Sequence, residues 1–91
     1  MYELFPAYDS ARSFYGKAVV RDYGVLESYG TPVARRVLDG STWRVELYPS
    51  WAYSATTLRH VKEFIRQTLQ GQELPCKLTK SNIAKQFAVI C

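Results

Sequence analysis

Three basic residues of one predicted helix are spaced so that they share a face. Arg59, Lys62 and Arg66 fall within residues 54–70, and a period of 3.6 residues brings positions i, i+3 and i+7 onto one ridge, opposite the apolar stripe. Two interpretations are open. The ridge is either a solvated face on which Glu63 pairs locally with Arg59 or Arg66, or a contact for phosphate or an acidic protein surface.

A second group of cations lies in a predicted hairpin. The Asp-Gly dipeptide at 39–40 is a strong turn signal, because both residue types tolerate positive φ. A two-residue loop there puts Arg35 opposite Arg44, and a loop that is one residue longer puts Arg36 opposite it. Like charges are unfavourable in either register unless an anion or a nearby carboxylate such as Glu46 compensates. The hairpin is therefore a candidate anion site, with Glu46 and solvent screening as the alternative.

Three aromatic residues cluster at the junction between the last predicted strand and the helix. Tyr48, Trp51 and Tyr53 lie within six positions, next to Pro49. Exposed rings at this point could stack on bases or anchor a protein partner. Alternatively they close the open end of a small core, which suits Trp51 because its large ring is costly to leave in water.

The remaining reactive residues do not predict catalysis. His60 is the only histidine and lies at the border between the apolar and polar helix faces. No second His or nearby Cys completes a metal site, no G-x-S-x-G motif places a serine beside it, and Gly-rich phosphate loops are absent. Cys76 and Cys91 are expected to be free thiols. We expect no enzyme, no cofactor and no metal.

The elements that position these residues begin with an antiparallel meander. Strands are predicted at residues 15–21, 25–29, 33–38 and 42–48. A turn at 22–24 joins the first two, and residues 30–32 break the chain before the third. In the fourth, Trp43, Val45 and Leu47 alternate with polar residues, as on a sheet with one buried face.

One main helix follows at residues 54–70, with Ser54 or Thr56 as its N-cap and Gly71 after its end. The inward stripe is Leu58, Val61, Phe64, Ile65, Thr68 and Leu69. Threonines in the first turn could also receive an anion beside the exposed amides, with simple capping as the alternative. Residues 1–13 are predicted to form an extended arm, anchored by Tyr2, Leu4 and Phe5. Residues 78–87 are predicted to form a short second helix, capped by Thr79 or Ser81.

These elements define an α+β fold, in which a small antiparallel meander of three to four strands packs on one amphipathic helix. The 91 residues leave room for a single domain. Twelve basic and eight acidic residues give a formal charge of +4, which suits an anionic partner. Because the N-terminus lacks signal-peptide features and no apolar run reaches ~18 residues, we expect a cytoplasmic protein without membrane contact.

Three stretches resemble a family of small uncharacterised bacteriophage and prophage proteins. They read SFYGKA at 13–18, SYGTPVA at 28–34 and YSATTLRHVKEF at 53–64, followed by a similar tail at 78–84. The resemblance covers residues 8–86. It implies an accessory protein without assigned chemistry that binds host machinery, and inhibitors of CRISPR effectors are one class of that size.

The chain departs from that pattern in its longer connection at 41–51 and its hydrophobic end at 87–90, so partner choice does not transfer. The leading hypothesis is a non-enzymatic accessory protein that binds a host protein or nucleoprotein, such as a CRISPR effector, through the helix ridge and the arginine hairpin. The alternative is a direct nucleic-acid-binding regulator, whose affinity would fall steeply with salt.

Overall fold

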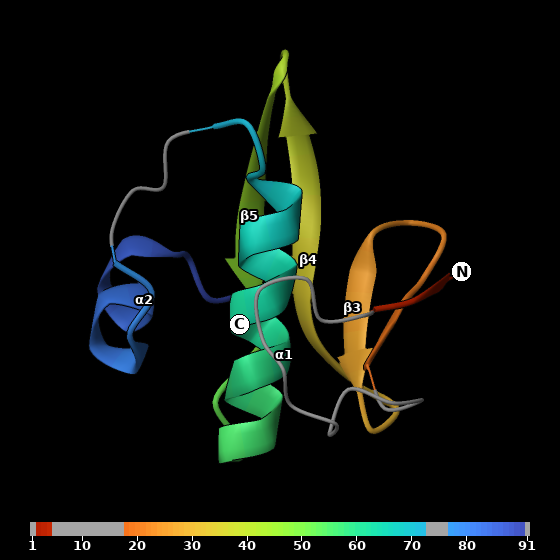
Figure 1. Ribbon diagram of the computed structural model, residues 1–91, viewed down its shortest axis with the longest axis vertical. Helices are drawn as coiled ribbons and strands as arrows, with labels where there is room; N and C mark the ends of the chain where they lie inside the picture. Colours follow the sequence, from red (N-terminus) through yellow and green to blue (C-terminus); the bar gives the residue numbers. More distant parts are fainter. Residues whose placement is uncertain (1, 5–17, 73–76, 91) are drawn as a thin grey trace.

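The computed structural model describes residues 2–4, 18–72 and 77–90. Five strands form one antiparallel sheet in the order β1-β2-β3-β4-β5, so each strand pairs with its neighbours in sequence. They are β1 (Tyr2–Glu3), β2 (Ala18–Val20), β3 (Val25–Ser28), β4 (Thr31–Asp39) and β5 (Thr42–Leu47). Helix α1 (Ala55–Thr68) packs on one face of the sheet, and α2 (Lys80–Gln86) lies to one side of α1 (Figure 1). The predicted α+β meander is confirmed, with a fifth strand.

The fifth strand comes from the predicted N-terminal arm. Tyr2 lies opposite Val20 in the register of β1 and β2. Leu4 follows directly and is 1% exposed in the core, which explains why this end of the chain is held against the sheet. Phe5, the rest of the arm and residues 15–17 of the first predicted strand lie outside the described residues.

The predicted break at 30–32 is correct in placing a turn before the third predicted strand but wrong in its extent. The chain reverses at Tyr29 and Gly30, which both have positive φ, and β4 already begins at Thr31. Pro32 is tolerated because it lies opposite Glu27, where the register shifts between Leu26 and Glu27, and irregular strand positions accept residues that cannot donate a ladder hydrogen bond.

Helix α1 matches its predicted limits to within two residues at each end. The Ser54 side chain caps it by accepting a hydrogen bond from the Thr57 amide at 3.1 Å, and Gly71 turns the chain beyond the last turn with φ +85°. Helix α2 is confirmed, with Thr79 rather than Ser81 as its N-cap.

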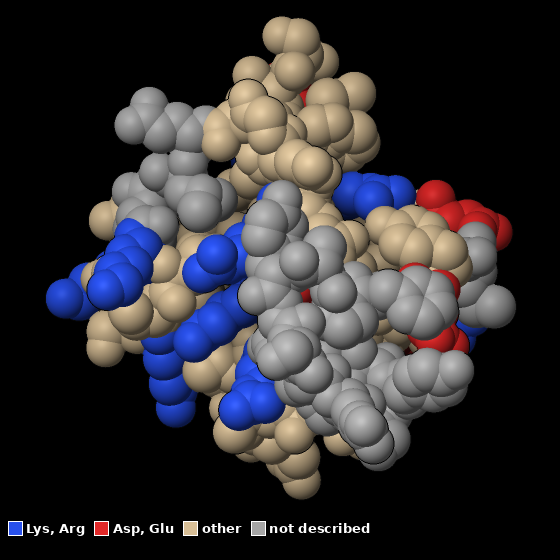
Figure 2. Space-filling model, in the orientation of Figure 1, with Lys and Arg blue, Asp and Glu red and all other residues tan. Residues whose placement is uncertain are grey.

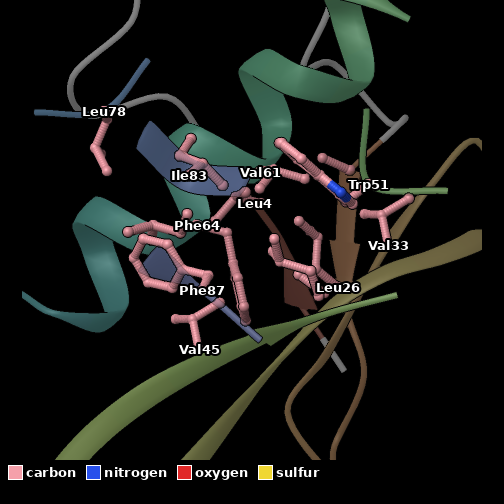
Figure 3. Close-up of a cluster of buried hydrophobic side chains, with 14 of the residues drawn as sticks. Leu4, Leu26, Val33, Val45, Trp51, Val61, Phe64, Leu78, Ile83 and Phe87 are labelled. Atoms are coloured by element: carbon pink, nitrogen blue, oxygen red, sulfur yellow. The ribbon is translucent and has the colours of Figure 1, made fainter. Parts of the chain in front are cut away.

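The core is one apolar layer between the sheet and the helices. Figure 3 shows Val33 and Val45 from the sheet, Phe64 from α1, and Ile83 and Phe87 from the C-terminal segment converging on it. The apolar end of the chain also pairs with the sheet, because the Leu47 amide donates to the Ala88 carbonyl at 2.8 Å and Leu47 bridges to Val89. The C-terminal segment therefore covers the core beside β5.

The predicted inward stripe of α1 is largely correct. Val61, Phe64, Ile65 and Leu69 are buried, whereas Leu58 is partly buried at the margin of the core and Thr68 is half-buried. The buried face is wider than the stripe, because Thr57, His60 and Glu63 are also buried. These three polar residues lie on the side of α1 that the apolar pattern did not mark.

Candidate functional site

The predicted ridge of α1 points outward and continues onto the second helix. Arg59 and Arg66 are exposed and Lys62 is half-exposed. Three exposed lysines, Lys77, Lys80 and Lys85, lie just before and along α2. We call these six residues the basic helix face. Figure 2 shows basic side chains gathered over α2 and the neighbouring side of α1, while the visible carboxylates lie mostly over the opposite side of the molecule.

The one carboxylate carried by the two helices is buried. Glu63 is 2% exposed and accepts a hydrogen bond from Gln67 Nε2 at 2.6 Å. The predicted pairing of Glu63 with Arg59 or Arg66 is therefore wrong, and no ion pair joins Glu63 to either arginine within the described part of the chain. Because α1 and α2 expose no carboxylate, the exposed charges of the two helices are all positive.

The register of the second hairpin differs from both predicted registers. Asp39 pairs with Thr42, so the loop is Gly40-Ser41, and Arg35 lies opposite Glu46. A one-residue shift of the turn moves every cross-strand partner by two positions, so the predicted arginine–arginine pair does not form. Val37 lies opposite Arg44, and Val45 opposite Arg36.

Glu46 compensates the hairpin charge instead. Arg35 Nη2 lies 2.7 Å from Glu46 Oε1, and Arg44 contacts Asp39 at 2.9 Å and the second Glu46 oxygen at 3.3 Å. The hydrogen bond from Arg35 holds the pKa of the Glu46 carboxyl below its usual range, and the same contact raises the pKa of Arg35. This cluster is internally neutralised, so it lacks the excess charge that an anion site needs.

Arg36 is separated from this pair on the opposite face of β4. Its guanidinium lies 5.8 Å from the ring centre of Tyr2 and 5.7 Å from that of Trp43, and Nη1 donates to the Tyr2 hydroxyl at 2.9 Å. Cation–π contacts of this kind hold the side chain in place. The three hairpin arginines therefore do not form one site.

The three aromatic residues at the junction also differ in burial and do not form one cluster. Trp51 is 8% exposed and belongs to the core, which confirms the structural interpretation for this residue. Tyr48 is half-buried beside Arg35. Tyr53 is 86% exposed and stands at the rim of a pocket.

This pocket has a volume of about 640 Å³ and was not predicted from the sequence. Most of its wall residues come from the β3–β4 turn and the start of α1; both segments lie at the lower end of the view in Figure 1. Within the described part of the chain, its wall residues are Ser28, Tyr29, Thr31, Val33, Ser50, Tyr53, Ser54, Thr56 and Thr57. Eight of these nine residues carry a hydroxyl group, and none carries a formal charge at neutral pH.

A buried polar network forms the floor of the pocket. Ser28 Oγ lies 2.7 Å from His60 Nδ1 and 3.3 Å from Thr57 Oγ1, and Ser54 Oγ donates to Thr57 Oγ1 at 3.1 Å. Ser28, Thr57 and His60 are at most 3% exposed. His60 is thus a core residue, and it meets a serine that is 32 positions away in the sequence.

One signal in the sequence could have indicated this pocket. The SYGTPVA stretch at 28–34 and the YSATTLRH stretch at 53–60 are both dense in hydroxyl side chains, and together they supply eight of the nine wall residues. No local rule places one stretch against the other, because their contact depends on how α1 crosses the sheet.

The fold and these surfaces define a small α+β domain with one basic helical face and one hydroxyl-lined pocket. The chain belongs to a family of unknown function, DUF8033, whose model matches residues 2–82. No curated protein and no solved structure matches it significantly. The family match does not tie the chain to phage proteins. Among the described residues, no helix has the length and apolar character needed to cross a bilayer.

Proposed function

We propose that this chain is a non-enzymatic binding protein that docks its basic helix face on an acidic surface of a host protein or nucleoprotein. The observation that carries the proposal is the separation of charge on the helices. They expose basic side chains, whereas their carboxylate, Glu63, is 2% exposed. Such a face attracts an anionic surface over about 8 Å at physiological ionic strength and accelerates encounter with it.

The finer form of the proposal is a phage-type accessory protein that acts in the host cytoplasm, with a CRISPR effector as one candidate target. It is supported by the stretches at 13–18, 28–34 and 53–64 and by analogy with other small phage proteins. The charge separation supports only the broader statement, an acidic partner.

The aromatic residues favour a protein or nucleoprotein surface over bare single-stranded nucleic acid. Proteins that bind single strands stack bases on exposed rings. Phe64 is the aromatic residue of α1 and is 1% exposed, and α2 contains none. Contact with a duplex backbone requires only charge, so a direct nucleic-acid-binding regulator is the second candidate function.

Affinity capture from a bacterial lysate tests the leading proposal. We would compare the native chain with a helix variant carrying Arg59→Gln, Lys62→Gln and Arg66→Gln. The matched control carries Arg21→Gln, Arg36→Gln and Arg44→Gln, and so loses the same number of positive charges from in and beside the sheet. We expect the helix variant to lose at least about tenfold of the captured partner and the control to stay within about twofold. Equal capture by both variants would refute the role of the helix face.

Nuclease treatment and salt separate the two candidates. Capture that survives nuclease supports a protein contact. A direct regulator would instead bind a generic duplex, and its logarithmic affinity would fall with the logarithm of salt with a slope of about −0.9 per phosphate contact. No duplex binding at low salt would remove this second candidate.

A further inference from the structure

The hydroxyl-lined pocket plays no part in the proposed binding by the basic helix face. Its volume of about 640 Å³ lies within the range of about 300–1,000 Å³ that is usual for small-molecule sites. Among the residues that the structure describes, its walls contain no Asp, Glu, Lys or Arg. A pocket of this size whose described walls carry no formal charge suits a small neutral ligand better than an ion.

The floor of the pocket presents hydroxyl groups in fixed positions. Ser28 is held between His60 Nδ1 and Thr57 Oγ1, at 2.7 and 3.3 Å, and Ser54 fixes Thr57 from the other side. A hydroxyl group can donate one hydrogen bond and accept two. A surface of ordered hydroxyls therefore complements a ligand that itself carries several adjacent hydroxyls.

Two tyrosine rings stand at the rim. Tyr29 and Tyr53 are 54% and 86% exposed, and the Tyr29 ring lies 5.9 Å from that of His60. Exposed rings at the rim of the pocket offer flat apolar surfaces against which a ligand ring can stack.

The backbone at Tyr29 is in a region that a bulky residue rarely adopts. Its φ is +53°, and Gly30 follows with φ +80°. A two-residue hairpin with both angles positive strongly prefers Asn, Asp or Gly at its first position, and a bulky side chain there is strained. The chain nevertheless places a tyrosine ring at this point of the pocket rim, which is expected if the ring contacts a ligand.

We propose that the pocket binds a small uncharged ligand built on a sugar ring. The ligand hydroxyls meet the serine and threonine side chains of the walls, and the apolar face of the ring stacks on Tyr53 or Tyr29. Glycosides and nucleosides share this chemistry. The inference is independent of the proposed docking on an acidic partner, because no residue of the basic helix face lines the pocket.

Amide NMR titration of the full chain tests the proposal. The probes are methyl glycosides of common hexoses and pentoses, the four ribonucleosides, and the 5′-monophosphates of those nucleosides. We expect saturable shifts at residues 28–33 and 50–57 with glycosides or with nucleosides, and the responding group identifies the source of the sugar. A deoxy analogue of the best ligand should bind up to about tenfold more weakly, because a wall hydroxyl loses its partner.

Matched tyrosine variants locate the contact. Tyr53→Ala should weaken binding by at least about fivefold, whereas Tyr23→Ala, which removes another exposed ring at the β2–β3 turn outside the pocket, should leave affinity unchanged. Tyr29→Asn keeps the turn, since Asn accepts positive φ, and should also weaken binding.

Three results would overturn the inference. The first is the absence of saturable shifts with every probe. The second is equal weakening by Tyr53→Ala and Tyr23→Ala, which would place the contact elsewhere. The third is binding of the monophosphates but not of the parent nucleosides, which would assign the pocket to an anion at the N-terminus of α1.

Discussion

The sheet and the helices use the same kinds of charged residue in opposite ways. In the sheet, Arg35 lies 2.7 Å from Glu46 and Arg44 contacts Asp39 and Glu46. Just after β2, Arg21 lies 2.9 Å from Glu27 of β3. On the helices, Arg59 and Lys62 form no ion pair within the part of the chain that the structure describes.

The difference follows from how each element arranges its neighbours. In an antiparallel pair, residues that face each other lie close enough for opposite charges to meet. On α1 the acid that could have paired with the ridge, Glu63, lies on the buried side, so pairing along the helix surface is lost. The charged residues in and beside the sheet therefore pair within the fold, whereas α1 exposes basic residues with no exposed acid among them.

The largest expected effect comes from disturbing the way the sheet holds Arg36. Gly24 has φ +84°, and an added Cβ would lie 2.9 Å from Arg36 Cγ. We expect Gly24→Ala to lower the free energy of unfolding by about 2–3 kcal/mol, from backbone strain plus displacement of the arginine stem. Chemical denaturation measures this change.

Gly40→Ala is the matched control. Gly40 also has a positive φ, +65°, but among the described residues beyond its two chain neighbours no atom lies within 4 Å of the added Cβ. Backbone strain alone should cost about 1 kcal/mol at this position. If both variants are destabilised equally, the packing of Arg36 over Gly24 contributes nothing to the stability of the sheet.

The exact position of the turn between β4 and β5 could not be predicted from the sequence. Residues 39–41 read Asp-Gly-Ser, and a two-residue turn can be centred on either dipeptide, because Gly40 supplies the positive φ in both. Both choices leave the same faces buried and exposed. They differ in whether Arg44 or Glu46 lies opposite Arg35. The ion pair between Arg35 and Glu46 favours the register that the structure has. Helix α1, by contrast, was predictable from its cap, its periodicity and Gly71.

The pocket was beyond sequence reasoning for a different reason. His60 carried no local motif, and its partner, Ser28, belongs to a strand 32 positions earlier. The apolar stripe of α1 was read from hydrophobic residues alone, so a histidine, a glutamate and a threonine on its buried side went unmarked. Only the packing of α1 against the end of β3 brings Ser28, Thr57 and His60 together.

The second prediction concerns the ion pairs of the sheet. Glu46→Gln removes the carboxylate that Arg35 and Arg44 share, and we expect a loss of roughly 0.5–1 kcal/mol at pH 7 because the arginines are half-exposed and screened. Lys62→Gln on the helices should change the stability by less than about 0.5 kcal/mol. Thermal unfolding of both variants shows whether the charged residues of the sheet contribute more to stability than those of the helices.

The pH dependence supplies an independent check. Since the pKa of Glu46 is depressed below its ordinary value of 4.5 in the folded chain, its contribution is fully present above pH 4.5 and is lost as the pH falls through the lower, folded pKa. The native chain should therefore lose more stability than Glu46→Gln between pH 6 and pH 3. Parallel acid profiles for the two proteins would contradict a stabilising role for this carboxylate.

The smallest expected change in stability is also the most informative about the helices. Helix α1 has no acidic residue in its first turn, and Ala55, its first residue, is exposed. Ala55→Glu places a carboxylate near the positive end of the helix dipole and four residues before Arg59. Both interactions are favourable, so we expect an increase of about 0.5 kcal/mol in the free energy of unfolding.

Ala55→Glu should also weaken partner capture. The new carboxylate would form an ion pair with Arg59, as carboxylates of the sheet do with their arginines, and would reduce the positive charge available to the partner. Ala55→Gln controls for side-chain size without charge and should leave both properties nearly unchanged. If Ala55→Glu raises the thermal midpoint and lowers capture, the acid-free surface of α1 serves binding at the expense of stability. If the midpoint rises and capture is unaffected, the contact with the partner does not extend to Arg59 and must lie toward Lys62, Arg66 and α2.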